Sequence, residues 1–297
     1  MLGLLLLNMG VAAMFCLLVI PHLFGIDPSA LSAGNINTDA DRYGMLVYQG
    51  IVSIWGFLGT AYLFSYLEVR DIPARLSTTV RPQLKVVVVA VLSILIAQLF
   101  IELLVNINKA IPLPHQMEET FRGVQAQEEQ LMTKMLQFSG IGSLIVGAIV
   151  IAVIPAIGEE FFFRALVLGG MLRAKWNPIV SIFLSGFLFA LAHAQFDNML
   201  AIWLMGAFLG YLYYTSGSIW LSVIVHLVNN FLTVLLKYLY ATGQVSSDLA
   251  EASPPVWVSL IAMAAFALCV FLFHKWRANT EFAAEQDPFT LNENHLL

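Results

Sequence analysis

The sequence predicts an all-α, polytopic integral membrane protein, a helical bundle with about eight transmembrane helices. Hydrophobic residues make up 59% of the 297-residue chain. Charged residues make up only 11%, whereas about 25% is usual for a soluble domain. Apolar runs long enough to cross about 30 Å of hydrocarbon also recur along the whole chain. Because no dense run of Lys and Arg is present, we expect no nucleic-acid partner.

The expected spans follow one another with mostly short connections. The first run lacks the basic residues that open a signal peptide and exceeds its usual apolar length of about 7–15 residues, so we expect an uncleaved helix. The small residues at 29–33 leave cleavage open. Two runs are short for a helix that needs about 20 residues to cross. The spans lie at about residues 1–24, 44–67, 84–107, 138–164, 178–194 (short), 198–214 (short), 218–240 and 255–274.

Basic residues gather in alternate connections between these spans. Lys and Arg are retained on the cytoplasmic side of a membrane, so these connections define that side. We therefore expect both termini to be cytoplasmic. Separately from this argument, we expect the membrane to be the plasma membrane of a bacterium. The basic residues are Arg70, Arg75, Arg81, Lys85, Arg173, Lys175, Lys275 and Arg277.

Three charged residues interrupt the fourth span. A charge at the bilayer centre costs at least about 2.5–3.5 kcal/mol, so such residues are expected to have partners and a function. Glu160 and Arg164 are four residues apart and share a helix face, which predicts an ion pair between them. Glu159 lies about 100° further round the helix and is left for a different partner.

Other polar side chains stand in later apolar runs. His193 lies four residues after Phe189, and Asn230 lies four residues after His226, so each pair shares a helix face. Together with Glu159, these groups suit the hydrolysis of an amide. A carboxylate can take a proton from water, and an imidazole can hold that water or pass the proton to the leaving amine. Asn and His N–H groups can bind the oxyanion of the tetrahedral intermediate.

Three motifs in this order resemble those of the CAAX-protease and bacteriocin-processing (CPBP) family. This family of intramembrane proteases includes the eukaryotic CAAX prenyl endopeptidases and the bacterial Abi proteins. The resemblance covers about residues 140–240. The motifs are Glu159-Glu160-x-x-x-Arg164, Phe189-x-x-x-His193 and His226-x-x-x-Asn230.

The resemblance implies an eight-helix endopeptidase that requires no cofactor and cleaves a membrane-associated peptide or protein within the bilayer. It implies that Glu159 activates water with help from His193, and that His226 and Asn230 form the oxyanion hole. Family members are often called metalloproteases, whereas the mechanism proposed for the family is that of a glutamate protease. The implied supporting residues are Glu160, Arg164 and Phe189.

We expect the chain to be organised in four parts. Transmembrane helices and an interfacial loop occupy residues 1–136, and within that loop residues 117–135 are expected to form an amphipathic helix at the membrane surface. The catalytic helical core is expected at 137–240. A C-terminal transmembrane helix follows at 241–278, and the polar tail 279–297 is expected to be disordered.

Alternative functions remain open at this point. A zinc-dependent version of the protease would use Glu159, His193 and His226 as ligands with an open fourth position, although the His-Glu-x-x-His signature is absent. A proton-coupled transporter or channel would use the buried charges as a relay. A transporter would carry polar residues across the full membrane, yet runs 86–104 and 256–273 have almost none. A non-catalytic immunity or scaffold protein is the last alternative.

Overall fold

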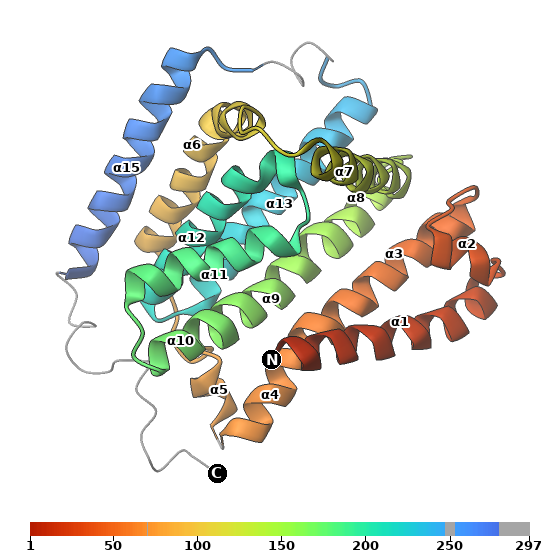
Figure 1. Ribbon diagram of the computed structural model, residues 1–297, viewed down its shortest axis with the longest axis horizontal. Coiled ribbons are helices and arrows are strands. Elements are labelled where there is room, and N and C mark those ends of the chain that lie inside the picture. Colours follow the sequence, from red (N-terminus) through yellow and green to blue (C-terminus); the bar gives the residue numbers. More distant parts are fainter. Residues whose placement is uncertain (70, 247–252, 279–297) are drawn as a thin grey trace. The chain divides into compact units, whose positions relative to one another are not determined.

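The computed structural model of the protein describes residues 1–69, 71–246 and 253–278. Within these ranges every regular element is a helix, and this confirms the predicted all-α class (Figure 1). The chain divides into two compact units. The first comprises Met1–Phe64, Ala126–Phe162 and Asn230–Glu251, and the second comprises Ser65–Gln125, Phe163–Asn229 and Ala252–Leu297.

Long apolar helices confirm the prediction of an integral membrane protein with many spans. In the described part of the chain, seven helices have the length and composition to cross a membrane, and the shorter apolar helix Pro178–Ala192 corresponds to an expected short span. The seven are Leu2–Phe24, Asp39–Glu68, Leu84–Lys109, Ile141–Arg173, Phe196–Ser216, Ile219–Ala241 and Val256–Lys275.

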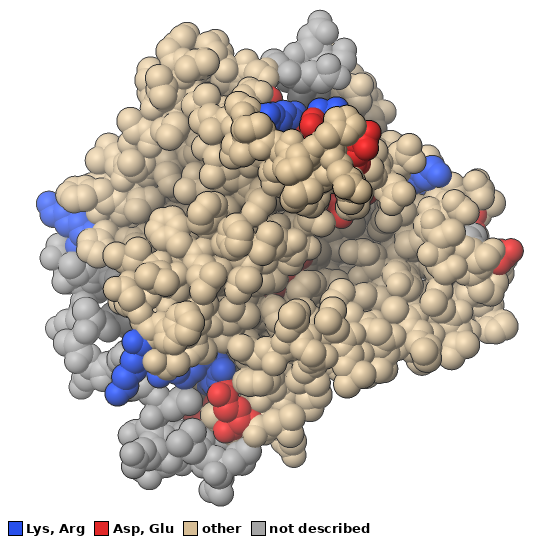
Figure 2. Space-filling view, in the orientation of Figure 1, with Lys and Arg blue, Asp and Glu red and all other residues tan. Residues whose placement is uncertain are grey.

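The outer surface of these helices is apolar. Leu7 on the first helix is 62% exposed, and Ile261 on the last is also 62% exposed. On the face seen in Figure 2, acidic and basic side chains form a few small groups, and the other described residues of that face are uncharged. Large apolar side chains that point outward cost little when the surroundings are lipid, so this surface agrees with a membrane location.

The first unit contains the helices near the N-terminus and the first part of the fourth span. Helix α3 begins with a capping box, in which the Thr38 hydroxyl accepts from the Asp41 N–H and the Asp41 carboxylate accepts from the Thr38 N–H. A buried cluster that includes Cys16, Met45 and Val150 joins α1, α3 and η2. The elements are α1 (Leu2–Phe24), α2 (Pro28–Ala33), α3 (Asp39–Ser53), the π-helix η1 (Ile54–Gly59), α8 (Ile141–Gly147), the π-helix η2 (Ala148–Val153) and α9 (Ile154–Glu160).

Several helices continue from one unit into the other along the chain. The helix predicted within 117–135 is present as α7, and its position at a membrane surface stays a prediction. The predicted part boundaries at 136, 240 and 278 also stay predictions, and the predicted disordered tail 279–297 lies outside the described residues. These continuous elements are α4 (Thr60–Glu68), α7 (His115–Met135), the π-helix η3 (Phe161–Leu168) and α13 (Ile219–Ala241).

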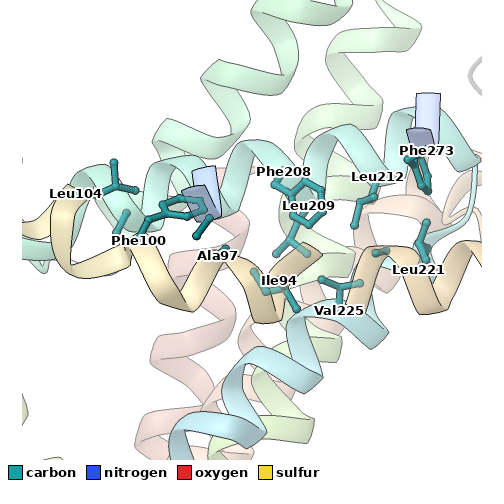
Figure 3. Close-up of a cluster of buried hydrophobic side chains, with 13 residues drawn as sticks. Ile94, Ala97, Phe100, Leu104, Phe208, Leu209, Leu212, Leu221, Val225 and Phe273 are labelled. Atoms are coloured by element: carbon teal, nitrogen blue, oxygen red, sulfur yellow. The ribbon is translucent and has the colours of Figure 1, made fainter. Parts of the chain in front are cut away.

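The second unit has the larger buried apolar cluster, formed mainly by α6, α12, α13 and α15 (Figure 3). Phe100 of α6, Leu212 of α12 and Val225 of α13 are almost completely buried in it. Because lipid tails are as apolar as these side chains, close packing rather than water exclusion holds such helices together. The elements that lie wholly in this unit are α5 (Ile72–Arg75), α6 (Leu84–Lys109), α10 (Gly169–Arg173), α11 (Pro178–Ala192), the 3-10 helix η4 (Phe196–Asn198), α12 (Met199–Ser216) and α15 (Val256–Ala278).

Candidate active site

The glutamate pair lies on a short α-helical stretch between two π-helices. Helix α9 has only seven residues, with η2 before it and η3 after it. Pro155 stands near its start. A proline lacks the N–H group, and its ring clashes with the carbonyl four residues earlier, so a wider preceding turn relieves that clash. Single π turns are frequent at functional sites, and here they flank the residues predicted to be catalytic.

The first unit holds both glutamates and Asn230. Glu160 is completely buried, whereas Glu159 and Asn230 are partly exposed. Gly158 brings this turn close to η1, since a Cβ built on it would lie 3.2 Å from Cβ of Phe57. A side chain at position 158 would therefore require a shift of a few tenths of an ångström between this turn and η1.

The second unit gathers three predicted residues around the aromatic ring of a fourth. The ring of Phe189, which is completely buried, has its centroid 4.4 Å from that of the His193 ring and 5.7 Å from that of the His226 ring. The guanidinium carbon of Arg164 lies 4.5 Å from the same centroid. Phe189 therefore contacts both imidazoles and one buried cation. A cation over an aromatic ring is favourable, more so away from water.

Arg164 also binds the backbone of α12. Its Nη2 donates to the carbonyl oxygen of Gly206 over 3.0 Å, and the side chain is completely buried. At this level α11 and α12 are in direct backbone contact, since a Cβ built on Gly186 would lie 2.6 Å from the backbone nitrogen of Ala207. Small residues allow such close helix crossings in membranes. The predicted ion pair between Glu160 and Arg164 stays a prediction.

His193 is held in a defined tautomer by its own helix. It follows the last turn of α11, and its Nδ1 lies 2.8 Å from the carbonyl oxygen of Phe189. A carbonyl oxygen can only accept, so Nδ1 must carry the proton. When the ring is neutral, Nε2 therefore has the free lone pair. The side chain is partly exposed, so Nε2 is suited to act as a base or to bind water.

His226 is almost completely buried on α13, with 1% of its surface exposed. One turn earlier, the Ser222 hydroxyl donates to the carbonyl oxygen of Leu209 over 3.0 Å and fastens α13 to α12. The rings of His226 and Phe189 meet edge to face at an interplanar angle of 76°. The His226 ring is thus held by its contact with Phe189 and by the attachment of α13 to α12.

Carbonyl groups of η3 accept hydrogen bonds from side chains of other elements. The Ser185 hydroxyl donates to the carbonyl oxygen of Phe163 over 3.0 Å. The carbonyl oxygen of Ala165 accepts from both Arg75 and Arg173, at 2.8 and 2.9 Å. These three donors from outside η3 attach its backbone to the neighbouring elements.

Sequence reasoning missed two amide side chains of α6. Gln98 donates to the side-chain oxygen of Asn229, the residue before Asn230, over 3.0 Å. Asn108 donates to the carbonyl oxygen of Phe196, three residues after His193, over 2.7 Å. Gln98 could have been noticed, because it is a polar residue within an apolar run. Asn108 gave no such signal, because it stands at the polar end of its helix.

A metal site would need several His, Cys, Asp or Glu side chains close together. Among the residues that the structure describes, no group of three or more such side chains lies together in an arrangement that could hold a metal ion. Of the three ligands expected for zinc, Glu159 belongs to the first unit, and the two histidines belong to the second. The zinc alternative stays a prediction.

Residues 141–232 are similar to a known protein family. This segment matches the family model described as "Type II CAAX prenyl endopeptidase Rce1-like". The matched residues include all three motifs, from Glu159 to Asn230. This stretch is similar to that family, and we call it the Rce1-like segment. The resemblance to the CAAX-protease family that the motifs indicated is thereby confirmed.

One curated relative also matches part of this chain. It is a protein of Bacillus subtilis (strain 168) with the name "Putative membrane peptidase YdiL". The two sequences are 28% identical over 89 residues, which cover 30% of this chain and 36% of the relative. The chain thus spans little more than a third of that relative's length. No solved structure gives a significant match to the chain.

Proposed function

We propose that the protein is an intramembrane endopeptidase that hydrolyses a peptide bond of a membrane-associated peptide or protein. The observation that carries this proposal is the grouping of His193 and His226 on the ring of Phe189 within the Rce1-like segment. Residues that only join membrane helices need no such grouping of imidazoles. The similarity to a family of prenyl endopeptidases supports the same reaction class.

The proposed reaction begins with water as the nucleophile. Glu159 takes a proton from the water, and Nε2 of His193 accepts a hydrogen bond from it and orients it. The water oxygen then bonds to the carbonyl carbon of the substrate. As the C–N bond breaks, the proton passes to the leaving nitrogen, so the products are a carboxylic acid and an amine.

The proposed oxyanion hole consists of N–H groups from His226 and Asn230. Both residues lie on α13, four positions apart, and therefore share a face of that helix. Removal of one oxyanion donor typically costs about 2.7–4 kcal/mol of transition-state stabilisation. Burial of His226 keeps bulk water away from its ring and strengthens such a bond.

The supporting residues are proposed to fix the catalytic groups. Arg164 joins η3 to α12 through Gly206 and to α11 through the Phe189 ring, so it holds the helix that follows the glutamates. Glu160, completely buried, is proposed to balance the charge of Arg164. Phe189 keeps the two imidazole rings at a constant separation.

The test is cleavage by purified protein in liposomes. Membrane-anchored peptides would be incubated with the wild type and with Glu159→Gln, and the new termini would be identified by mass spectrometry. We expect Glu159→Gln to lower kcat by about 10²–10⁴-fold, the usual contribution of a general base. Glu128→Gln on α7 is the matched control, since this glutamate is partly exposed and lies outside the apolar spans. Full activity of Glu159→Gln would exclude the proposal.

A zinc-dependent form of the same reaction is a second candidate. A histidine that binds zinc usually donates its other ring N–H to a carbonyl, as His193 does to Phe189. Glu159, His193 and His226 would hold the ion, which would supply Lewis-acid activation of water or substrate. Stoichiometric zinc in protein purified without added metal, with activity lost to a chelator and restored by zinc, would support this form.

We also propose a bacterial plasma membrane with both termini on the cytoplasmic side. The basic residues of alternate connections support this orientation. Labelling of single cysteines in intact cells tests it. A cysteine near Arg81 should resist a membrane-impermeant reagent, and one in the 115–135 segment should react with it; the opposite pattern would reverse the orientation.

A further inference from the structure

Helix α6 lies outside the Rce1-like segment and carries none of the predicted site residues. Two of its side chains nevertheless reach into that segment, each just after one of the two histidines. Gln98 and Asn108 are both amides, and an amide can donate and accept at the same time. Within the second unit, α6 is therefore linked by side-chain hydrogen bonds to both histidine-bearing parts of the chain.

Asn108 uses both ends of its amide. Its Nδ2 donates to the carbonyl oxygen of Phe196 over 2.7 Å, and its Oδ1 accepts from the N–H of Leu200 over 3.0 Å. These partners fix the orientation of the amide, because a carbonyl only accepts and an N–H only donates. Leu200 lies in the first turn of α12, where N–H groups have no partner within the helix. Asn108, 3% exposed, thus caps α12 from a different helix.

The loop that Asn108 binds is the one that begins at His193. Only Ala194 and Gln195 separate His193 from Phe196. Ala194 has φ of +53°, a left-handed conformation that costs a residue with a Cβ about 1–2 kcal/mol. The Phe121 ring of α7 stacks on Phe196 with centroids 5.0 Å apart. A displacement of Phe196 is thus transmitted to His193 through a short, conformationally restricted link.

Gln98 binds the turn of α13 that follows His226. Its Nε2 donates to Oδ1 of Asn229 over 3.0 Å and lies 3.2 Å from the carbonyl oxygen of Ile94. Asn229 is three residues after His226, so it shares that side of α13. A side-chain hydrogen bond between two membrane helices contributes about 0.6–2 kcal/mol to their association. That is enough to favour one rotation of a helix about its axis.

We propose that α6 is a positioning helix, in which Asn108 sets the place of His193 and Gln98 sets the place of His226. The effect of this positioning on catalysis rests on the function proposed above. The positioning of the two histidines does not depend on that function. Neither amide touches the reacting atoms. Each acts through the segment that carries an imidazole.

The decisive variants separate this role from helix stability. Asn108→Asp keeps an oxygen that can cap Leu200, but it loses the donor to Phe196 and places a carboxylate against a carbonyl. Gln98→Met keeps the length of the side chain and removes the bond to Asn229. Ser93→Ala is the matched control on α6, because the Ser93 hydroxyl bonds only Val89 of its own helix.

The readout is NMR of ¹⁵N-labelled histidine in the full-length protein, which has six histidines. Signals of His193 and His226 would be assigned with His→Gln variants. We expect Asn108→Asp to shift or broaden the His193 signals alone, Gln98→Met to affect those of His226 alone, and Ser93→Ala to leave both unchanged. Unchanged His193 signals in Asn108→Asp would overturn the proposal, as would a joint change of both histidines in every variant.

Measurement of kcat and KM for the same α6 variants tests whether the positioning of the histidines affects catalysis. A displaced imidazole should lower kcat by about 10–100-fold while KM changes little, because misplacement by about 1 Å can cost 10²-fold. A purely structural role would reduce the folded fraction and leave kcat per folded molecule unchanged, which would contradict the catalytic meaning. If the wild type cleaves no substrate while the NMR pattern appears as expected, the proposed function fails and the positioning role stands.

Discussion

The backbone contact between α11 and α12 allows a quantitative prediction for Gly186→Ala. The new Cβ would lie 2.6 Å from the backbone nitrogen of Ala207, whereas ordinary contacts begin at 3.4 Å. The obstructing atoms are backbone, so the two helices must separate by about 0.8 Å. The guanidinium of Arg164 rests on Phe189 of α11, so the shift would also draw Arg164 away from α12 and break its 3.0 Å bond to Gly206.

Two costs follow from this separation. Overpacking of a tight interior typically costs about 1–3 kcal/mol. Loss of a hydrogen bond to a charged group costs about 1.5–3 kcal/mol. The two overlap, so we expect Gly186→Ala to lower the free energy of unfolding by about 2–5 kcal/mol. Because α11 also carries Phe189 and leads to His193, kcat should fall at least about 10-fold.

The assay is reversible unfolding in mixed micelles, together with peptide cleavage. Gly170→Ala on α10 is the control, because a Cβ there meets nothing within 4 Å. This change should be neutral or stabilise the helix by up to about 1 kcal/mol. If Gly186→Ala proves as stable and as active as Gly170→Ala, the helices do not cross as closely as described, and the argument is wrong.

Three further predictions concern contacts around the site. Phe189→Leu should lower kcat by about 10–100-fold, because both imidazoles lose their common neighbour; unchanged peptide cleavage would refute this. Arg75→Gln should lower the free energy of unfolding, measured in mixed micelles, by about 1–3 kcal/mol. Because Glu68 is 38% exposed, its ion pair with Arg75 contributes little. We assign most of the loss to the hydrogen bond from Arg75 to the η3 backbone. Ser185→Ala should cost about 1–2 kcal/mol, because it leaves a buried carbonyl of η3 without its donor. Ser181→Ala should cost less than that, because its hydroxyl bonds within its own helix, and equal costs for the two serine variants would argue against a special role for η3.

The positions of the membrane helices were predictable from the sequence. Length and apolar composition determine a span, and the runs expected near 84–107 and 218–240 correspond closely to α6 and α13. The π-helices were not predictable, because the residues of η2 and η3 have the same apolar character as those of an α-helix. Pro155 was the one local sign of an irregular helix there.

The candidate site was predictable only in part. Glu159 and the two histidines were identified because polar residues are rare in apolar helices. Their faces followed from helical periodicity, but periodicity within one helix does not say which side chain of another helix it meets. The central place of Phe189 and the bonds of Asn108 depend on contacts between distant parts of the chain, and those contacts come from the fold.

The wide turns of η3 bear on how such chains tolerate changes in length. A π-helix accommodates one residue more than the α-helix it replaces, so deletion of a single residue within Phe161–Leu168 could be absorbed by a return to regular α-helix. A single deletion between Gln98 and Asn108 of α6 would rotate Asn108 by about 100° relative to Gln98 and break their alignment. The folded structure should therefore tolerate a deletion in η3 better than one between Gln98 and Asn108. Activity should suffer in both cases, because a deletion between Glu160 and Arg164 also rotates the glutamate pair relative to Arg164.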